Sequence, residues 1–85
     1  VEILDADKVI LREHLMIKVK KDEASGAQLI AIANAFHASV LQVGKDAMAL
    51  ELSGDVRQLN SFVEMLKPFG VLEMIRTGAM AMTVS

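Results

Sequence analysis

The same pattern of apolar residues occurs twice in this chain, and this repeat limits the folds that the chain can adopt. Its first copy runs from Leu29 to Phe36, and its second from Leu59 to Leu66, thirty positions further on. Both copies place apolar residues at positions i, i+3, i+4 and i+7, which form one face of a helix. Those residues are Leu29, Ile32, Ala33, Phe36, Leu59, Phe62, Val63 and Leu66. The chain is therefore expected to contain two equivalent helices.

The residues before each apolar stripe predict where the helices begin. Ser25 stands three residues before Gln28, and Asp55 stands three residues before Gln58. A side-chain oxygen followed three residues later by Gln or Glu is the capping-box signature, which satisfies unpaired N–H groups of the first turn. Both helices are therefore predicted to start with a side-chain cap.

Four segments beside the helices have the pattern of strands. Segment 14–20 alternates, with Leu15, Ile17 and Val19 on one side. The other three segments are 39–43, 47–53 and 71–75. The stretch 44–46, Gly-Lys-Asp, reads as the turn of a hairpin between the middle two. Pro68 and Gly70 suit the end of the second helix and the turn that follows it.

The order of these elements predicts an α+β domain with the ferredoxin-like βαββαβ fold. Its four-stranded antiparallel sheet would carry both helices on one face. We expect residues 12–85 to form this domain and residues 1–11 to be a linker or an N-terminal extension, although Val9 to Leu11 could lengthen the first strand. A chain of 85 residues has room for one such domain.

The fold alone does not decide function, so individual sites must be tested. An RNA-binding sheet would need aromatic residues on its central strands, and the chain has neither Trp nor Tyr. A net charge of −2 and the lack of a basic block speak against nucleic acid. With no Cys, a thiolate metal site is excluded. No apolar run reaches the length of a membrane span and no secretory signal is visible, so we expect a cytoplasmic protein that does not bind membranes.

No catalytic, cofactor-binding or metal-binding residue is predicted. The loop at 20–26 has a single glycine and two carboxylates, Asp22 and Glu23, which would repel a phosphate. It also lacks the Asp-x-Pro-Gly sequence usual in the ligand loop of ACT-type amino-acid sensors. His14 and His37 are two isolated histidines without a third ligand, and these make a poor metal site. We therefore expect a chain that is not an enzyme and holds no cofactor.

An apolar patch is expected on the face of the sheet that the helices leave open. Met16 and Met74 alternate away from the predicted core, and Leu72 and Ala49 are placed with them. The run 79–83 looks like a further strand beyond Thr77-Gly78, which could pair with a second chain. Because a bare apolar sheet face is an aggregation hazard, the patch predicts association with protein and a homodimer in particular.

The end of the chain carries the clearest functional signal. It reads Phe69-Gly70-Val71-Leu72-Glu73-Met74-Ile75-Arg76-Thr77-Gly78. This run resembles the closing motif of the small, regulatory subunit of acetolactate synthase, with Phe69-Gly70 and Arg76-Thr77-Gly78 as its specific part. The resemblance extends from about Arg12 to Thr83, and also includes Arg12-Glu13 ahead of the first strand.

This resemblance implies a non-catalytic domain of branched-chain amino-acid biosynthesis. In the family, a C-terminal ferredoxin-like domain follows an ACT domain that binds the feedback amino acid, and this chain resembles only the C-terminal domain. Its partner would be the large catalytic subunit, which uses thiamine diphosphate, Mg²⁺ and FAD. None of these should bind to this chain. Arg76, Thr77 and Gly78 join the apolar patch as candidate partner contacts.

Some positions depart from the family, and they leave a second interpretation open. The family commonly has Arg where His37 and Ser39 stand and Asp where Gln42 stands, and a basic residue often replaces Ala79. The alternative is a stand-alone ACT-like module for ligand sensing or oligomerisation, with an unrelated partner. An ACT domain upstream of Val1 would favour the first interpretation.

Overall fold

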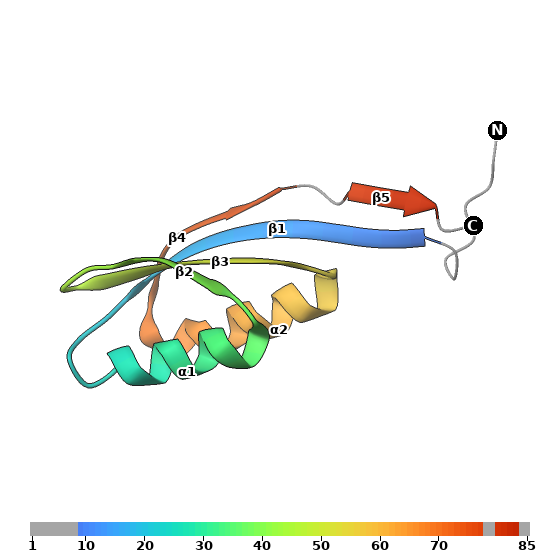
Figure 1. Cartoon of the computed structure of the whole chain (residues 1–85). Coiled ribbons are helices and arrows are strands. Elements are labelled where there is room, and N and C mark those ends of the chain that lie inside the picture. The colour runs from blue at the N-terminus through green and yellow to red at the C-terminus, as the bar shows by residue number, and fades with distance from the viewer. Residues whose placement is uncertain (1–8, 78–79, 84–85) are drawn as a thin grey trace.

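The computed structural model describes residues 9–77 and 80–83, which form one sheet and two helices (Figure 1). The elements in chain order are β1 (Val9–Lys20), α1 (Gly26–Phe36), β2 (Ser39–Val43), β3 (Ala47–Gly54), α2 (Val56–Leu66), the short 3₁₀ helix η2 (Lys67–Phe69), β4 (Val71–Arg76) and β5 (Met80–Thr83). Both helices lie against the same side of the sheet. The predicted ferredoxin-like arrangement is therefore confirmed.

The sheet is antiparallel and is built around β1. Its strands follow the order β2-β3-β1-β4, and β5 pairs with the first part of β1. The register places Ile17 opposite both Leu50 of β3 and Met74 of β4. Because β1 starts at Val9, the described strand begins within the segment that the sequence assigns to an extension.

The core lies between the helices and one face of the sheet. Phe62 of α2 is fully buried, and its ring centroid lies 5.2 Å from that of Phe36 in α1. The buried residues are Leu15, Ile17, Val19, Leu29, Ala33, Met48, Leu50, Leu52, Leu59, Phe62, Val63 and Leu66, with Ile32 and Phe36 packed against them. All eight positions of the repeated pattern thus face the core, as the repeat predicts.

The two predicted helix caps differ in the structure. Asp55 accepts a hydrogen bond from the backbone N–H of Gln58 at 2.7 Å, which caps α2 as expected. The prediction is wrong for Ser25, whose side chain makes no cap bond to α1. Its hydroxyl instead accepts from the backbone N–H of Asp22 at 2.9 Å, because the preceding turn offers a closer partner.

Strand β5 corrects a second expectation. The sequence suggested that the run 79–83 pairs with another chain, but Met80–Thr83 pairs with Val9–Arg12 of β1 in the same chain. Beyond the main body of the sheet, β1 and β5 thus continue as a two-stranded ribbon (Figure 1). The strand itself exists where the alternation predicts it.

Helix α1 ends at a residue in an unusual conformation, and this gives a stability prediction. His37 has φ 58° and ψ 35°, the left-handed region, and the backbone N–H of Ala38 reaches back to the carbonyl of Ala33. In this conformation a residue with a Cβ destabilises the folded state by about 1 kcal/mol or more, whereas Gly does not. After the greater flexibility of Gly in the unfolded chain is subtracted, His37→Gly should raise the free energy of unfolding by roughly 0.5–1 kcal/mol.

Chemical denaturation of the two proteins measures this difference. The matched control is Ala31→Gly, at an exposed position in the interior of the same helix, which should be destabilising by about 0.5–1 kcal/mol. A His37→Gly protein that is less stable than the parent chain would contradict the strain assigned to this cap.

Candidate interaction surface

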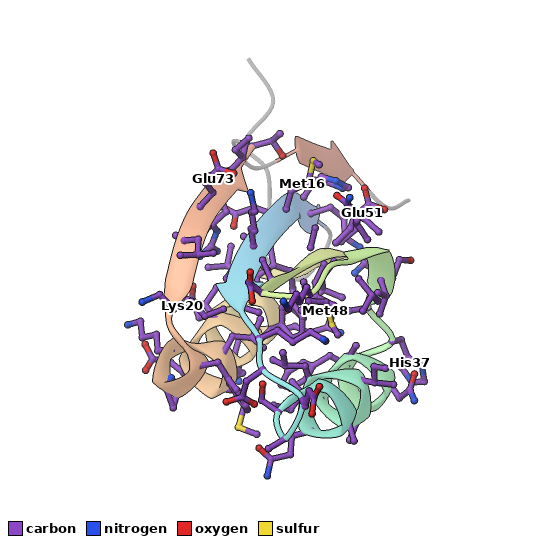
Figure 2. The ribbon with its side chains drawn as sticks, turned by 90° about the vertical axis from the view of Figure 1, so that its left-hand side faces the viewer. Met16, Lys20, His37, Met48, Glu51 and Glu73 are labelled. Carbon is purple, nitrogen blue, oxygen red and sulfur yellow. The ribbon has the colours of Figure 1, made fainter. Side chains whose placement is uncertain are left out.

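The face of the sheet opposite the helices is open, and its residues are fixed by the strand register. Residues directly opposite one another in antiparallel strands point to the same face. One row across the sheet contains Ile75, Met16, Glu51 and Ser39, and the next contains Glu73, Lys18, Ala49 and Gln42. We call these residues the open face. Figure 2 shows Met16, Glu51 and Glu73 away from the helices and Met48 on the helix side.

The middle of the open face is apolar and hollowed. Met16 is 40% exposed and Ile75 is 63% exposed, and the small side chain of Ala49 lies in the neighbouring row. A hollow of about 240 Å³ is lined by these three residues together with Leu41 of β2 and others. Large apolar side chains exposed side by side are typical of surfaces that bind protein.

Charged residues surround this apolar centre. Lys18 and Glu73 form an ion pair at 3.7 Å across β1 and β4. His14 Nε2 lies 3.1 Å from a carboxylate oxygen of Glu51, and its Nδ1 lies 2.8 Å from the hydroxyl of Ser53. Because a carboxylate only accepts, His14 donates from Nε2 to Glu51. The open face therefore has an apolar centre with both signs of charge around it.

The structure corrects part of the patch that the sequence predicts. Met16 and Ala49 do lie on the open face, but Met74 is opposite the buried Ile17 and therefore belongs to the helix side, at the edge of the sheet. Leu72 has no partner on β1. Lys18 pairs with Glu73 and the next residue, Val19, pairs with Val71, so Leu72 is the extra residue of a β-bulge. This bulge reverses the side-chain alternation that a regular strand would have.

Sequence reasoning missed Ile75, which takes the place assigned to Met74. The Arg76 side chain points toward α2, and successive side chains of a strand point to opposite faces, so its neighbour Ile75 points to the open face. This alternation is the signal that could have identified Ile75. The sequence gives no comparable signal for the bulge at Leu72. Leu72 instead helps to line a second hollow of about 620 Å³, together with Lys20 and Asp22.

Arg76 and Thr77 make their contacts within the chain. The Arg76 side chain donates from Nε to Glu13 at 3.0 Å, also contacts Glu13 through a second nitrogen, and donates to Asn60 of α2 at 2.8 Å. The Thr77 hydroxyl accepts from the backbone N–H of His14 at 3.1 Å. These bonds hold the end of β4 against β1 and α2. Gly78 lies outside the described residues, so its predicted contact role stays a prediction.

The described residues offer little for metal binding. Within 9–77 and 80–83, no group of three His, Asp or Glu side chains could hold a metal ion. Hydrogen bonds from the Ser25 backbone N–H and then its hydroxyl lower the pKa of Asp22 below its ordinary value of 3.8, and these groups lie in an exposed turn. None of the helices described is long and apolar enough to cross a membrane.

Comparison with known proteins gives the class and then the family of this domain. The fold and its site define a small α+β domain whose open sheet face carries an apolar centre. Residues 12–85 match the model of the small subunit of acetolactate synthase. The chain belongs to this family, which is the non-catalytic subunit of the enzyme, and the resemblance seen in its final residues is confirmed.

Several relatives support this assignment. The chain is 33% identical over 81 residues to a probable acetolactate synthase small subunit of Methanothermobacter thermautotrophicus, covering 94% of this chain and 48% of that one. It is 38% identical to the Aquifex aeolicus small subunit, covering 84% and 38%. The crystal structure of the Thermotoga maritima small subunit superposes with a TM-score of 0.85 at 26% identity, covering 92% and 48%. The chain thus spans about half the length of these relatives, and corresponds to their C-terminal domain.

The contacts of Arg76 lead to a prediction about stability. Arg76 and Glu13 are mostly buried, with 26% and 16% of their side chains exposed, so each substitution leaves the other charge without its partner. We expect Arg76→Ala to lower the free energy of unfolding by about 2 kcal/mol, and Glu13→Ala by a similar amount. The double variant should cost about 1 kcal/mol less than the sum.

Chemical denaturation of the four proteins in this cycle measures the coupling. The exposed Lys18–Glu73 pair is the matched control, and its cycle should give a coupling near zero, at most about 0.5 kcal/mol. Equal coupling energies in the two cycles would show that Arg76 does not fix the end of β4.

Asp22 gives a prediction about pH. Its pKa is lowered in the folded chain, so its contribution to stability is present above pH 3.8 and is lost as the pH falls through the lower, folded value. Asp22→Asn should therefore be less stable than the parent chain at pH 7, and the difference should shrink on acidification below pH 3.8. Thermal unfolding at several pH values tests this.

The control variant for this experiment is Ser25→Ala, which removes the hydroxyl and keeps the backbone N–H that donates to Asp22 at 2.7 Å. Most of the pH dependence should remain in that variant. A constant difference between Asp22→Asn and the parent chain at all pH values would contradict the assigned shift.

Proposed function

We propose that this chain is the part of an acetolactate synthase small subunit that binds the large catalytic subunit and raises its activity. The observation that carries this proposal is the family match over residues 12–85, on a fold shared with the Thermotoga maritima small subunit. The chain contributes surface rather than chemistry, in agreement with an open face that holds apolar and charged groups, and with the lack of a metal-holding group of side chains among the described residues.

The proposal assigns amino-acid sensing to another part of the small subunit. In this chain, Asp22 and Ser25 close the loop after β1 on themselves: the Asp22 carboxylate accepts from the Ser25 N–H, and the Ser25 hydroxyl accepts from the Asp22 N–H. These groups are therefore already paired and offer little to the amino and carboxylate groups of an amino acid. This arrangement favours the regulatory domain over the alternative of a stand-alone ligand sensor.

An activation assay tests the proposal. Added to an acetolactate synthase catalytic subunit from the same organism, the chain should give a partial increase in acetolactate formation, because it supplies only about half of a small subunit. Valine should not inhibit this mixture. Calorimetric titration of the chain with valine, leucine and isoleucine should likewise show no sub-millimolar binding.

The control is Phe62→Ala, which removes a fully buried ring and should cost about 3–5 kcal/mol, enough to unfold a small domain. This variant should not activate. A folded parent chain that fails to activate, where a whole small subunit does activate, would contradict the proposed binding. Strong valine inhibition with this chain alone would contradict the placement of the sensor elsewhere.

A further inference from the structure

We propose that the hollow of about 620 Å³ at one end of the sheet binds a segment of the large catalytic subunit that carries an apolar side chain next to an acidic one. The hollow lies where the loop after β1, the turn between β2 and β3 and the short helix η2 meet, and its walls include Lys20, Lys21, Asp46, Pro68, Phe69 and Leu72. It shares no lining residue with the hollow of the open face. The inference rests on the proposed function, and it names the surface and the chemistry through which the two subunits meet.

The β-bulge in β4 supplies part of an apolar wall in this hollow. Leu72 is the extra residue of the bulge, lines the hollow and is 45% exposed. Pro68 and Phe69 of η2 line the hollow with it, and Phe69 is also packed against the core. Bulges frequently re-aim a side chain beside a functional site. The wall is therefore exposed apolar surface on a fixed support, which suits the insertion of an apolar side chain from a partner.

Two lysine side chains border the hollow, and each of them passes over a glycine. A Cβ added at Gly70 would lie 3.1 Å from Cδ of Lys20, and a Cβ added at Gly26 would lie 3.2 Å from Cε of Lys21. The two glycines thus leave room for the lysine stems against the backbone, and Lys20 lies beside the start of β4 (Figure 2). Within the described part of the chain, neither ammonium group takes part in an ion pair. Both lysines are therefore available to a carboxylate of a partner.

The backbone around the hollow is held in place before a partner binds. The N–H of Lys20 donates to the carbonyl of Gly70 at 2.8 Å, and the N–H of Lys21 donates to the carbonyl of Asp46 at 2.9 Å. The loop after β1 is closed by its own pair of hydrogen bonds, as described above. A site that is already ordered loses less conformational entropy on binding, so even a small contact of this kind can contribute to affinity.

The charges and the shape of the hollow favour an acidic segment of protein as its occupant. The Asp22 carboxylate accepts from the N–H of Ser25, so Asp46 supplies the carboxylate without a partner among the described lining residues, against two ammonium groups. This excess of positive charge is complementary to a carboxylate. Sites for small molecules bury most of their ligand, whereas the wall at Leu72 stays open to solvent and would be covered by a larger surface.

Titration of the catalytic subunit with the chain tests this contact, with binding measured by calorimetry and activation by acetolactate formation. Lys20→Gln and Lys21→Gln should each raise the dissociation constant about 3–10-fold, and Leu72→Ala should raise it about tenfold. Asp46→Asn should lower the constant about twofold, because it removes a charge of the same sign as the acidic segment. Added salt should weaken binding of the parent chain more than binding of a chain that carries both lysine substitutions.

The matched controls lie on the outer side of α2. Arg57→Gln removes an exposed cation and Met65→Ala shortens an apolar side chain that is 50% exposed, and both should leave the dissociation constant unchanged. Circular dichroism confirms that each variant is folded. Lys20→Gln, Lys21→Gln and Leu72→Ala chains that bind like the parent chain would overturn the proposal. Tighter binding by the lysine variants together with weaker binding by Asp46→Asn would also overturn it, since the occupant would then be basic.

The remaining outcomes separate this inference from the proposed function and from a site for a small molecule. A parent chain that binds and activates while the variants of the hollow behave like it overturns the inference alone. A chain whose binding depends on the hollow but which does not activate supports the inference and contradicts the proposed function, and a parent chain that does not bind contradicts both. Isovalerate, a branched carboxylate, is the small-molecule probe. Its sub-millimolar binding to the chain alone, lost in Lys20→Gln, would overturn the assignment of the hollow to a protein segment.

Discussion

The alternation of side chains along β1 is the constraint on which the rest of the domain depends. Leu15, Ile17 and Val19 are buried against the helices, and His14, Met16 and Lys18 between them point the other way. Because β1 pairs with β3, β4 and β5, its register fixes the two faces of the whole sheet. A shift of one residue would expose the core residues and turn Met16 and the charged Lys18 toward the helices. Core and open face are therefore set by one choice of register.

Much of this arrangement can be predicted from the sequence, and each prediction that is wrong has a particular physical cause. The repeated apolar stripe and the alternation of 14–20 suffice for two helices, the order of strands and the core. The sequence does not reveal the bulge at Leu72. Because of this bulge, Ile75 lies on the open face where the regular alternation predicts Met74. The spacing of Ser25 and Gln28 predicts a helix cap, because sequence spacing does not show that the turn with Asp22 competes for the Ser25 hydroxyl. The partner of β5 depended on long-range pairing, which local patterns do not specify.

The residues that best mark the family also stabilise the fold of this chain. Gly70 has φ 99°, a conformation that a side chain would strain, and its carbonyl accepts from the backbone N–H of Lys20 at 2.8 Å. Arg76 joins β4 to Glu13 and to α2, and Thr77 completes the pairing of β4 with His14. The motif thus closes the sheet. A motif of this kind identifies the family through its fold.

The two edges of the sheet suit association less well than its open face. All five residues of β2 are exposed, and its pairing with β3 slips between Val40 and Gln42. At the other edge, β4 carries the slip at Leu72. Bulges twist an edge and break its row of evenly spaced donors and acceptors, which hinders the addition of another strand. The open face has no such defect between His14 and Lys18 on β1. The apolar centre of this face is therefore carried by the most regular part of the described sheet.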